Sequence, residues 1–304
     1  MSGASRVLIT GGGGFVGSLL AAGFSDMGHK VTVLDMAFDD ATRERLAGVD
    51  LVEADLAQSD TTLRGLPAAD VVIHAAALTT NPEAFGLSPA EHVSANTLPL
   101  LAMLRHAGRV RPRAFVFLSS SGVFAEGDGS PDLADADPAT AQGPYSAAKR
   151  AGEALVPGAL AGVCAVHVVR LGYLYGPSEA ARPSRARVSM LRAWIDAARA
   201  GEALVVAAND PRRDWTWAPD LAPALGRLAE GEGRAAPVHL CRPDPIPDSR
   251  LANLIAQRVP GARVERGPVV PAKAPMVPSR LGALDGVTWT GPEQGIEALM
   301  RACT

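Results

Sequence analysis

The chain has 304 residues, of which 47% are hydrophobic and 20% charged, and its formal net charge at pH 7 is -3. This length allows one large α/β domain or a domain with a smaller lobe. No basic stretch is interleaved with aromatic residues, which gives no reason to expect nucleic acid as a partner. No run of 18 apolar residues could span a membrane. The first residues do not have the pattern of a cleaved leader, and we therefore expect a soluble, cytoplasmic protein.

Short apolar runs alternate with helix-length segments through the first two thirds of the chain. The first four runs are nearly continuously apolar, as expected where helices cover both faces of a parallel sheet. This alternation predicts an α/β fold with a doubly wound parallel sheet of the Rossmann type. The expected strands are residues 6–10, 30–35, 49–55, 70–76, 114–120 and 164–171, and the expected helices lie near residues 15–28, 40–47, 59–65, 88–108 and 144–161.

The composition of the sequence changes after about residue 172, where proline- and arginine-rich loops separate shorter helices and isolated strands. We predict a dinucleotide-binding domain over residues 1–172, to which parts of 210–242 return, and a smaller, mainly substrate-binding lobe over 173–304. Three widely spaced cysteines lack any disulfide or zinc-ligand spacing, so we expect free thiols and no metal site.

A glycine-rich turn lies between the first expected strand and the first expected helix. It reads LITGGGGFVG and spaces three glycines as Gly-x-x-Gly-x-x-Gly. Such glycines let the backbone turn tightly and approach a pyrophosphate, whose charge is stabilised by the helix N-terminus. The motif is weak alone, but the flanking strand and helix strengthen it. We expect a dinucleotide to contact Gly11, Gly14, Phe15, Val16 and Gly17.

An acidic residue, Asp35, ends the second expected strand about 20 residues further on. Its carboxylate can accept hydrogen bonds from the adenosine ribose and would repel a 2′-phosphate, and the following MAFDD offers no arginine. The cofactor expected is therefore NAD rather than NADP. The alternative is a turn-forming aspartate at a strand end.

Two further segments end strands on the same side of the sheet. Asp55 and Leu56 could reach the adenine, although Asp55 could equally be a helix cap. The sequence HAAA ends the fourth strand with three small residues, Ala75, Ala76 and Ala77, which would let a dinucleotide lie close to the backbone. His74 is interpreted as a packed histidine.

A tyrosine and a lysine four residues apart, Tyr145 and Lys149, occur in a chain with only three of each. Random placement would give about 0.03 such pairs. Residues i and i+4 share a helix face, and an ammonium beside a phenol favours the phenolate, which suits a general base. The lysine can also donate to the nicotinamide ribose. Three serines, 119–121, end the fifth strand at the expected ligand crevice, so that a serine hydroxyl can orient a substrate carbinol.

In these motifs the chain closely resembles the extended short-chain dehydrogenases/reductases, the NAD-dependent epimerase/dehydratase family. SSSGVFA fits the family's Ser-Ser-x-x-Val-Tyr-Gly, which implies Ser120 as the catalytic serine and Ser121 as the runner-up. Asn96 matches an asparagine of the long helix before the fifth strand. RLGYLYGP (170–177) and RRDWTWAPDLAPAL (212–225) resemble two further family motifs. The resemblance implies a catalytic set of Ser120, Tyr145 and Lys149.

Departures from the family pattern concern the substrate. Tyr173 replaces an asparagine usual in nucleotide-sugar enzymes, and AAND (207–210) replaces a Gly-Asp-Gly turn. Arg213 is kept and in the family commonly meets a substrate phosphate; the alternative is an ion pair with Asp214 or Asp220. The loop 177–188 is expected to be mobile and to lie over the substrate, where Arg182, Arg185 and Arg187 could clamp a phosphate or carboxylate or could simply be solvated.

The resemblance leaves three readings of the reaction. The first is an NAD-dependent oxidoreductase of a secondary hydroxyl on a sugar or sugar derivative, with a lean to a nucleotide-sugar 4-epimerase. The second is a net dehydrogenase of a free sugar or sugar acid, and the distant third a non-catalytic NAD-binding sensor. Dehydration is disfavoured because Ser121 and Gly122 stand where dehydratases carry Asp-Glu. Resemblance also implies a homodimer through the helices near 88–108 and 144–161.

Overall fold

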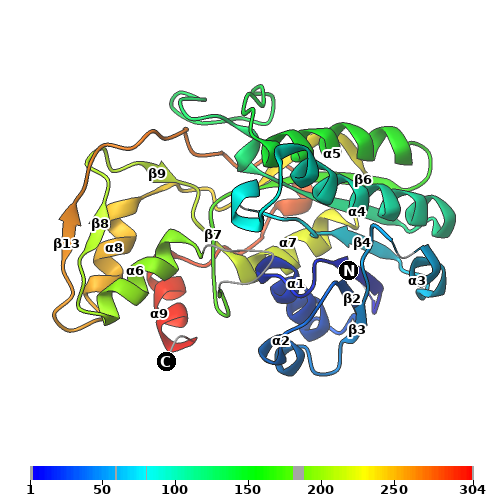
Figure 1. Ribbon diagram of the computed structural model, residues 1–304, viewed down its shortest axis with the longest axis horizontal. Coiled ribbons are helices and arrows are strands. Elements are labelled where there is room, and N and C mark those ends of the chain that lie inside the picture. Colours follow the sequence, from blue (N-terminus) through cyan, green and yellow to red (C-terminus); the bar gives the residue numbers. More distant parts are fainter. Residues whose placement is uncertain (1–2, 59, 80, 181–187, 303–304) are drawn as a thin grey trace.

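The computed structural model describes residues 3–58, 60–79, 81–180 and 188–302. A parallel sheet of seven strands forms the centre of its larger part (Figure 1), in the order β11-β6-β5-β4-β1-β2-β3. The first four strands in chain order are β1 (Arg6–Thr10), β2 (Lys30–Asp35), β3 (Asp50–Glu53) and β4 (Val71–His74). They are followed by β5 (Ala114–Ser120), β6 (Ala165–Leu171) and β11 (Arg234–Leu240). The order reverses at β1, so a crevice opens between the carboxyl ends of β1 and β4.

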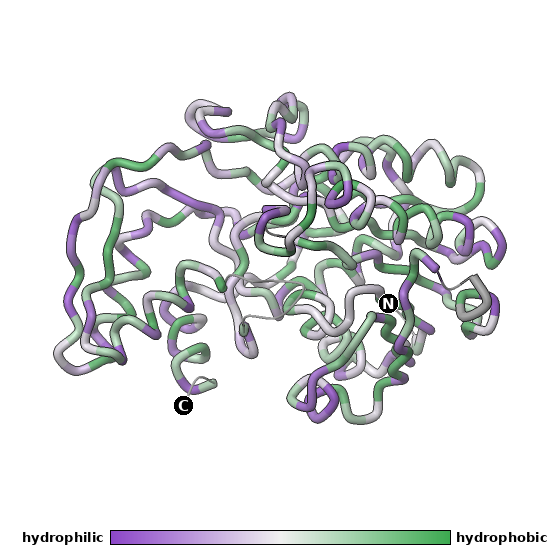
Figure 2. Tube along the Cα trace, in the orientation of Figure 1, coloured by the Kyte–Doolittle hydropathy of each residue, from purple (hydrophilic) through white to green (hydrophobic). Residues whose placement is uncertain are grey.

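Helices cover both faces of this sheet because both faces of its strands are apolar. On one face, α1 (Phe15–Asp26) and α7 (Leu221–Leu228) pack against the sheet around Phe24 and Leu225. On the other, α3 (Asp60–Gly65), α4 (Pro89–Val110) and α5 (Pro144–Leu160) pack around Met103 and Phe115. A short helix, α2 (Asp40–Arg45), follows β2. In Figure 2 the strands of the sheet are mostly coloured as hydrophobic, and hydrophilic stretches are more frequent in the outer loops.

A smaller lobe lies beside the carboxyl ends of the strands (Figure 1). Its helices α6 (Met190–Arg199), α8 (Asp248–Ala256) and α9 (Pro292–Ala302) enclose a separate core that includes Trp194, Trp215 and Ile255. Four short pairings connect its loops and the neighbouring segments. They join β7 (Leu174–Tyr175) to β10 (Thr216–Trp217), β9 (Arg212–Arg213) to β12 (Ile246–Pro247), and β8 (Leu204–Val206) to β13 (Val264–Arg266), with an isolated bridge between Leu133 and Met276.

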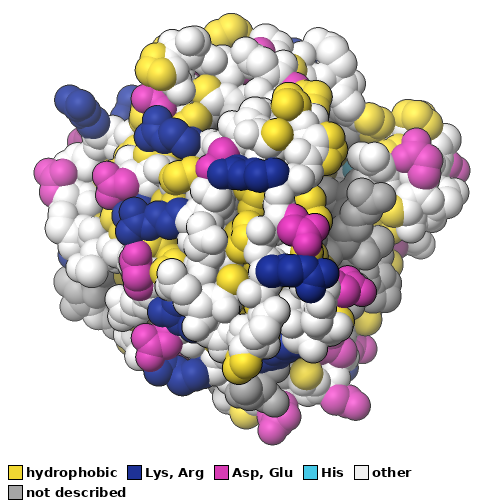
Figure 3. Space-filling model, turned by 90° about the vertical axis from the view of Figure 1, so that its left-hand side faces the viewer, with side chains coloured by type: hydrophobic (Ala, Val, Ile, Leu, Met, Phe, Trp, Pro, Cys, Tyr) yellow, Lys and Arg dark blue, Asp and Glu magenta, His cyan; other side chains and the backbone are white. Residues whose placement is uncertain are grey.

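The predicted elements of the larger domain are present, with their ends displaced by at most a few residues. The helix α9 and the short strands β7, β9, β10, β12 and β13 were not predicted. Strands of two or three residues are too short to show an alternating pattern, and α9 begins at a proline that follows a glycine. The surface of the smaller lobe in Figure 3 intersperses charged side chains with hydrophobic ones. Among the described residues, no helix combines the length and apolar character needed to cross a bilayer.

Candidate active site

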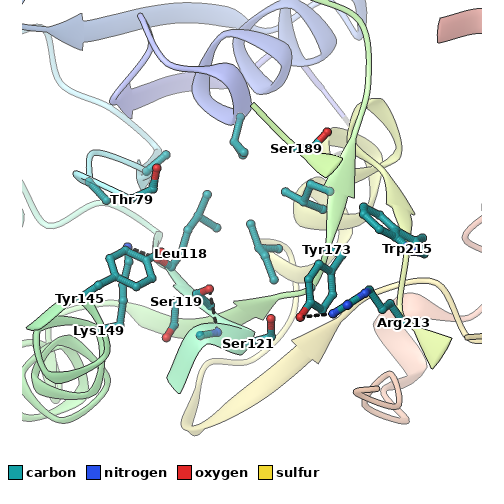
Figure 4. Close-up of a pocket in the computed structure, with 18 of the residues that line it drawn as sticks. Thr79, Leu118, Ser119, Ser121, Tyr145, Lys149, Tyr173, Ser189, Arg213 and Trp215 are labelled. Carbon is teal, nitrogen blue, oxygen red and sulfur yellow. Dashed lines mark hydrogen bonds between the residues drawn. The ribbon is translucent and has the colours of Figure 1, made fainter. Parts of the chain in front are cut away.

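A cavity of about 530 Å³ lies between the carboxyl ends of the strands and the smaller lobe (Figure 4). Its walls come from the start of α1, the ends of β4, β5 and β6, the start of α5, and segments of the smaller lobe. The expected site residues that line it are Val16, Ala75, Ala77, Ser120, Ser121, Tyr145, Lys149, Tyr173 and Arg213. The topology therefore brings together residues separated by up to 197 positions in the chain, as a crevice at a topological switch point does.

The glycine turn forms a close-packed cradle at the N-terminus of α1. Gly11 has a left-handed backbone with φ of +75°, and a Cβ there would lie 2.6 Å from the backbone nitrogen of Ala76. A Cβ on Gly17 would collide with the carbonyl oxygen of Gly11. Gly14 is the N-cap, so the first turn of α1 directs its backbone N–H groups towards this turn. These contacts fit a dinucleotide pyrophosphate, which needs bare backbone and a helix N-terminus.

Asp35 lies at the end of β2, beside the same turn. Its carboxylate accepts hydrogen bonds from the backbone nitrogen of Gly13 at 2.8 Å and from that of Met36 at 2.7 Å. The second bond is the turn-forming contact considered as an alternative, and the first places the carboxylate against the glycine turn. Asp35 therefore makes the turn-forming contact and also lies against the glycine turn. Its carboxylate is placed to accept hydrogen bonds from the ribose hydroxyls of a dinucleotide.

Of the small residues after β4, Ala75 and Ala77 line the cavity, whereas Ala76 packs against the core, and Asn96 fixes this loop. The amide oxygen of Asn96 accepts from the backbone nitrogen of Leu78 at 2.9 Å, and its amide nitrogen donates to the carbonyl of His92 at 2.9 Å. Asn96 is buried and shapes the loop that contains Ala77. His74 is buried, pairs with Thr10 at 2.9 Å, and burial lowers its pKa to about 3. It is therefore a packed neutral histidine.

Asp55 and Leu56 do not line the cavity. The Asp55 carboxylate accepts from the backbone nitrogen of Ala57 at 2.8 Å and from the Gln58 side chain at 3.0 Å, which is the local capping role considered as its alternative. Leu56 packs into the core under α3 and α4. A contact of this pair with adenine stays a prediction.

Tyr145 and Lys149 lie on the first turns of α5, which begins at Pro144 after the N-cap Gly143. The Lys149 ammonium lies 5.8 Å from the centre of the Tyr145 ring and 5.1 Å from that of Phe117. It donates to the carbonyl oxygen of Leu118 at 2.7 Å. Burial lowers the pKa of Lys149 to about 8, and the charge of Glu153 acts in the opposite direction. The ammonium is thus held beneath the phenol with protons left to donate.

The Ser120 hydroxyl and the Tyr145 ring converge on Gly122. A Cβ built on Gly122 would lie 3.2 Å from the Ser120 Oγ and 3.2 Å from Cε1 of the Tyr145 ring. The Oγ accepts a hydrogen bond from the backbone nitrogen of Gly122 at 3.0 Å, which orients the hydroxyl. A substrate carbinol placed there can meet the serine and the tyrosine together.

A buried ion pair between Arg170 and Glu153 fixes the helix that carries Tyr145 and Lys149 against the sheet. The Arg170 guanidinium donates to both carboxylate oxygens of Glu153 at 2.8 Å, and Ser119 donates to the same carboxylate at 2.6 Å. The Arg170 and Glu153 side chains are only 6% and 9% exposed. This network ties the Lys149 helix to β5 and β6. The sequence reasoning did not identify it.

Tyr173 and Arg213 lie at the other end of the cavity, beside Trp215 (Figure 4). Arg213 donates to the Tyr173 hydroxyl at 2.6 Å and through Nε to the Asp248 carboxylate at 3.0 Å.

The expected alternative partners of Arg213 were wrong, because Asp220 binds Thr290 instead, and Asp214 is turned away against Gly172. Burial raises the pKa of Asp214 to about 6 and raises that of Tyr173. Arg182 lies outside the described residues, as do Arg185 and Arg187.

The model of the NAD dependent epimerase/dehydratase family matches residues 7–237. The chain belongs to this family. The family is NAD-dependent, so the NAD cofactor expected from the sequence is confirmed. The glycine cradle and Asp35 described above fit the dinucleotide.

Among curated relatives, the chain is 26% identical over 270 residues to UDP-glucuronic acid decarboxylase 4 of Arabidopsis thaliana, covering 86% of this chain and 59% of that protein. The chain thus spans about three fifths of the length of this relative. It is 31% identical to UDP-glucose 4-epimerase of Streptomyces lividans, over 50% of this chain and 47% of the relative.

Solved structures share the fold across nearly the whole chain. The UDP-glucose 4-epimerase of Thermotoga maritima with UDP-glucose superposes with a TM-score of 0.83 at 18% identity, covering 98% of both chains. MoeE5 in complex with UDP-glucuronic acid and NAD gives 0.79 at 22% identity, again with 98% of both chains covered. At these identities the likeness shows the fold.

Several cavity residues of this family member were not singled out from the sequence, among them Ser189, Met190, Trp215, Lys273 and Thr79. The first three sit in segments that resemble ordinary helix starts or core. Lys273 had a usable signal, because it is one of three lysines against 26 arginines, the same rarity that drew attention to Lys149. In the part of the chain that the structure describes, no cluster of three potential metal ligands occurs.

Proposed function

We propose that this family member oxidises a secondary hydroxyl of a nucleotide sugar with NAD and returns the hydride to the opposite face, as a 4-epimerase. The observation that carries the proposal is the convergence of Ser120 and Tyr145 on one point of the cavity, with the Lys149 ammonium 5.8 Å from the tyrosine ring. Arg213 at the far end supplies a cation for a phosphate.

Each catalytic side chain has one task in this reaction. Ser120 holds the carbinol oxygen, and Tyr145 removes the hydroxyl proton as the hydride leaves the carbon that bears this hydroxyl. The Lys149 ammonium favours the phenolate and donates to the nicotinamide ribose. NAD, held by the glycine cradle, Asp35 and the small residues after β4, supplies the hydride acceptor. On return, Tyr145 gives the proton back to the re-formed alkoxide.

Arg213 is suited to hold the substrate's phosphate. Its Nε is bound by Asp248 and its Nη1 by the Tyr173 hydroxyl, so the planar group is fixed in orientation. Within the described residues, Nη2 makes no further hydrogen bond and can donate to a phosphate oxygen. The binding free energy of this Arg213–phosphate contact can be used to position the sugar ring over Ser120 and Tyr145.

The epimerase outcome competes with a net dehydrogenase. Ser121 and Gly122 stand where family dehydratases have an acidic pair, which argues against loss of water. Tyr173 favours the second candidate, a dehydrogenase of a free sugar or sugar acid, because its ring and its bond to Arg213 fill space near the phosphate end.

Cofactor content distinguishes these two reactions. Protein purified without added nucleotide is denatured, and the released NAD and NADH are quantified per chain. An epimerase recycles its hydride internally, so we expect near-stoichiometric NAD. An empty site, together with NADH formation on free sugars or sugar acids, would contradict the epimerase and support the dehydrogenase.

We also propose a homodimer through α4 and α5. These helices pack against each other, and Leu98 on α4 and Leu155 on α5 are 48% and 36% exposed. Sedimentation should give a dimer at micromolar concentration, and Leu98→Arg combined with Leu155→Arg should shift it to monomer. A monomeric wild type would contradict the proposal.

A further inference from the structure

Lys273 lines the cavity from a loop that follows β13, more than 110 residues after the end of the catalytic helix α5. Its ammonium donates to the carbonyl oxygen of Ser121 and lies 5.8 Å from the centre of the Tyr173 ring. The side chain lines the same cavity as Ser120 and Tyr145. None of the steps proposed above uses this lysine.

The charge of Lys273 is not neutralised by a direct ion pair. No carboxylate in the described ranges lies within ion-pair distance of its ammonium, although Asp214 and Asp128 act on it from further away and Arg213 repels it. Burial lowers its pKa to about 8, which leaves it mainly protonated at neutral pH. Arg213, in contrast, is paired with Asp248. A partly buried cation without a counter-ion is unfavourable, and an anionic ligand would compensate its charge.

The ammonium lies between the two ends of the cavity. Ser121, whose carbonyl it binds, directly follows Ser120, and Tyr173, whose ring it overlies, is bonded to Arg213. Figure 4 shows Ser121 between the Tyr145–Lys149 pair and the Tyr173–Arg213 pair. A sugar whose reacting carbon meets Ser120 and whose phosphate meets Arg213 would therefore pass beside Lys273.

We propose that Lys273 binds a carboxylate carried by the sugar ring, on a carbon next to the one that is oxidised. The preferred substrate is then a hexuronate rather than a neutral hexose. An ammonium has three donors, and the Ser121 carbonyl uses one, which leaves two for the carboxylate. This inference rests on the proposed nucleotide-sugar function and specifies its substrate class.

Binding measurements on the NAD-loaded protein test the inference. UDP-glucuronate and UDP-glucose differ only in having a carboxylate or a hydroxymethyl group on the ring, and UDP alone reports the phosphate end. Calorimetry with the three ligands is done on wild type, Lys273→Met, Lys273→Arg and the control Lys30→Met. Lys30 starts β2 and its side chain is exposed. Thermal unfolding and NAD binding show whether each variant is folded.

We expect wild type to bind UDP-glucuronate at least about tenfold more tightly than UDP-glucose, since a charge-assisted hydrogen bond is being compared with a neutral one. Lys273→Met should reduce that ratio to about one while UDP binding stays within about threefold. Lys273→Arg should keep part of the preference, and Lys30→Met all of it.

Three results would overturn the inference. These are no preference in wild type, a preference that survives in Lys273→Met, or an equal loss for UDP, UDP-glucose and UDP-glucuronate, which would place the ammonium on the diphosphate. If NAD binds but no UDP ligand does, the nucleotide-sugar proposal fails separately. Glucuronate and glucose are then compared in the same variants: a preference for glucuronate lost in Lys273→Met supports Lys273 as the carboxylate site, and its absence contradicts it.

Discussion

Lys149 and Glu153 lie one helical turn apart on α5 and both bind the end of β5. The Lys149 ammonium donates to the Leu118 carbonyl at 2.7 Å, and the Glu153 carboxylate accepts from the Ser119 hydroxyl at 2.6 Å. Two consecutive residues of the strand that leads to Ser120 are thus bound to the helix that carries Tyr145. The relative position of the serine and the tyrosine depends on this connection.

Glu153→Gln should affect both stability and the pH profile. It leaves Arg170 buried without its counter-ion, which should lower the free energy of unfolding by about 3 kcal/mol. It also removes the charge that raises the pKa of Lys149, so the ammonium should be lost at a pH below about 8. The alkaline limb of kcat/KM should move to lower pH. Glu297→Gln, in an exposed pair with Arg301, is the control, and an unmoved limb would contradict the assignment.

Gly122 should tolerate no side chain without a loss of turnover. In Gly122→Ala, the new Cβ would be 3.2 Å from both the Ser120 hydroxyl and the Tyr145 ring, so one of them must shift. We expect kcat to fall about tenfold, and further in Gly122→Val. Gly158→Ala, on the helix α5 that carries Tyr145, meets nothing within 4 Å and is the control. Unchanged kcat in both Gly122 variants would show that the two side chains do not act at this point.

Asp35→Ala should weaken discrimination between NAD and NADP. The carboxylate bonded to Gly13 would repel a 2′-phosphate, and its removal should reduce the ratio of the two dissociation constants at least about tenfold. The measurement is titration of the nucleotide-free protein with each cofactor, with the exposed Asp26→Ala as control. An unchanged ratio would locate the discrimination elsewhere.

Asp214→Asn should change how stability depends on pH. Burial raises the pKa of Asp214 from its usual 3.8 to about 6, so the folded state binds a proton more tightly than the unfolded state. The resulting stabilisation is complete below about pH 3.8 and is lost as pH rises through 6. Between pH 4.5 and 7.5 the variant should gain about 2 kcal/mol relative to wild type, measured by denaturant unfolding. A constant difference would contradict this.

The sequence was sufficient for the fold and for much of the cavity, for identifiable physical reasons. Long apolar strands and the glycine spacing are local patterns, and Tyr145 and Lys149 share one helix. Lys273 and the Glu153–Arg170 pair could not be placed in the same way, because each contact joins segments that the sequence does not show to be neighbours. Lys273 and Ser121 are 152 residues apart, and Glu153 and Arg170 are 17 residues apart on α5 and β6. Asp248 as the partner of Arg213 depends on the pairing of β9 with β12, which two-residue strands do not reveal.

The central claim is that Tyr145 is the base of an NAD-dependent oxidation, and the most direct test is the turnover of Tyr145→Phe. The variant is purified, its NAD content and affinity are measured, and kcat is determined with the nucleotide sugar that wild type converts. We predict that NAD binding is kept and that kcat falls by about 10²–10⁴-fold, since only the transferable proton has been removed. Wild-type turnover in Tyr145→Phe would contradict the account, because another group would then have to remove the proton.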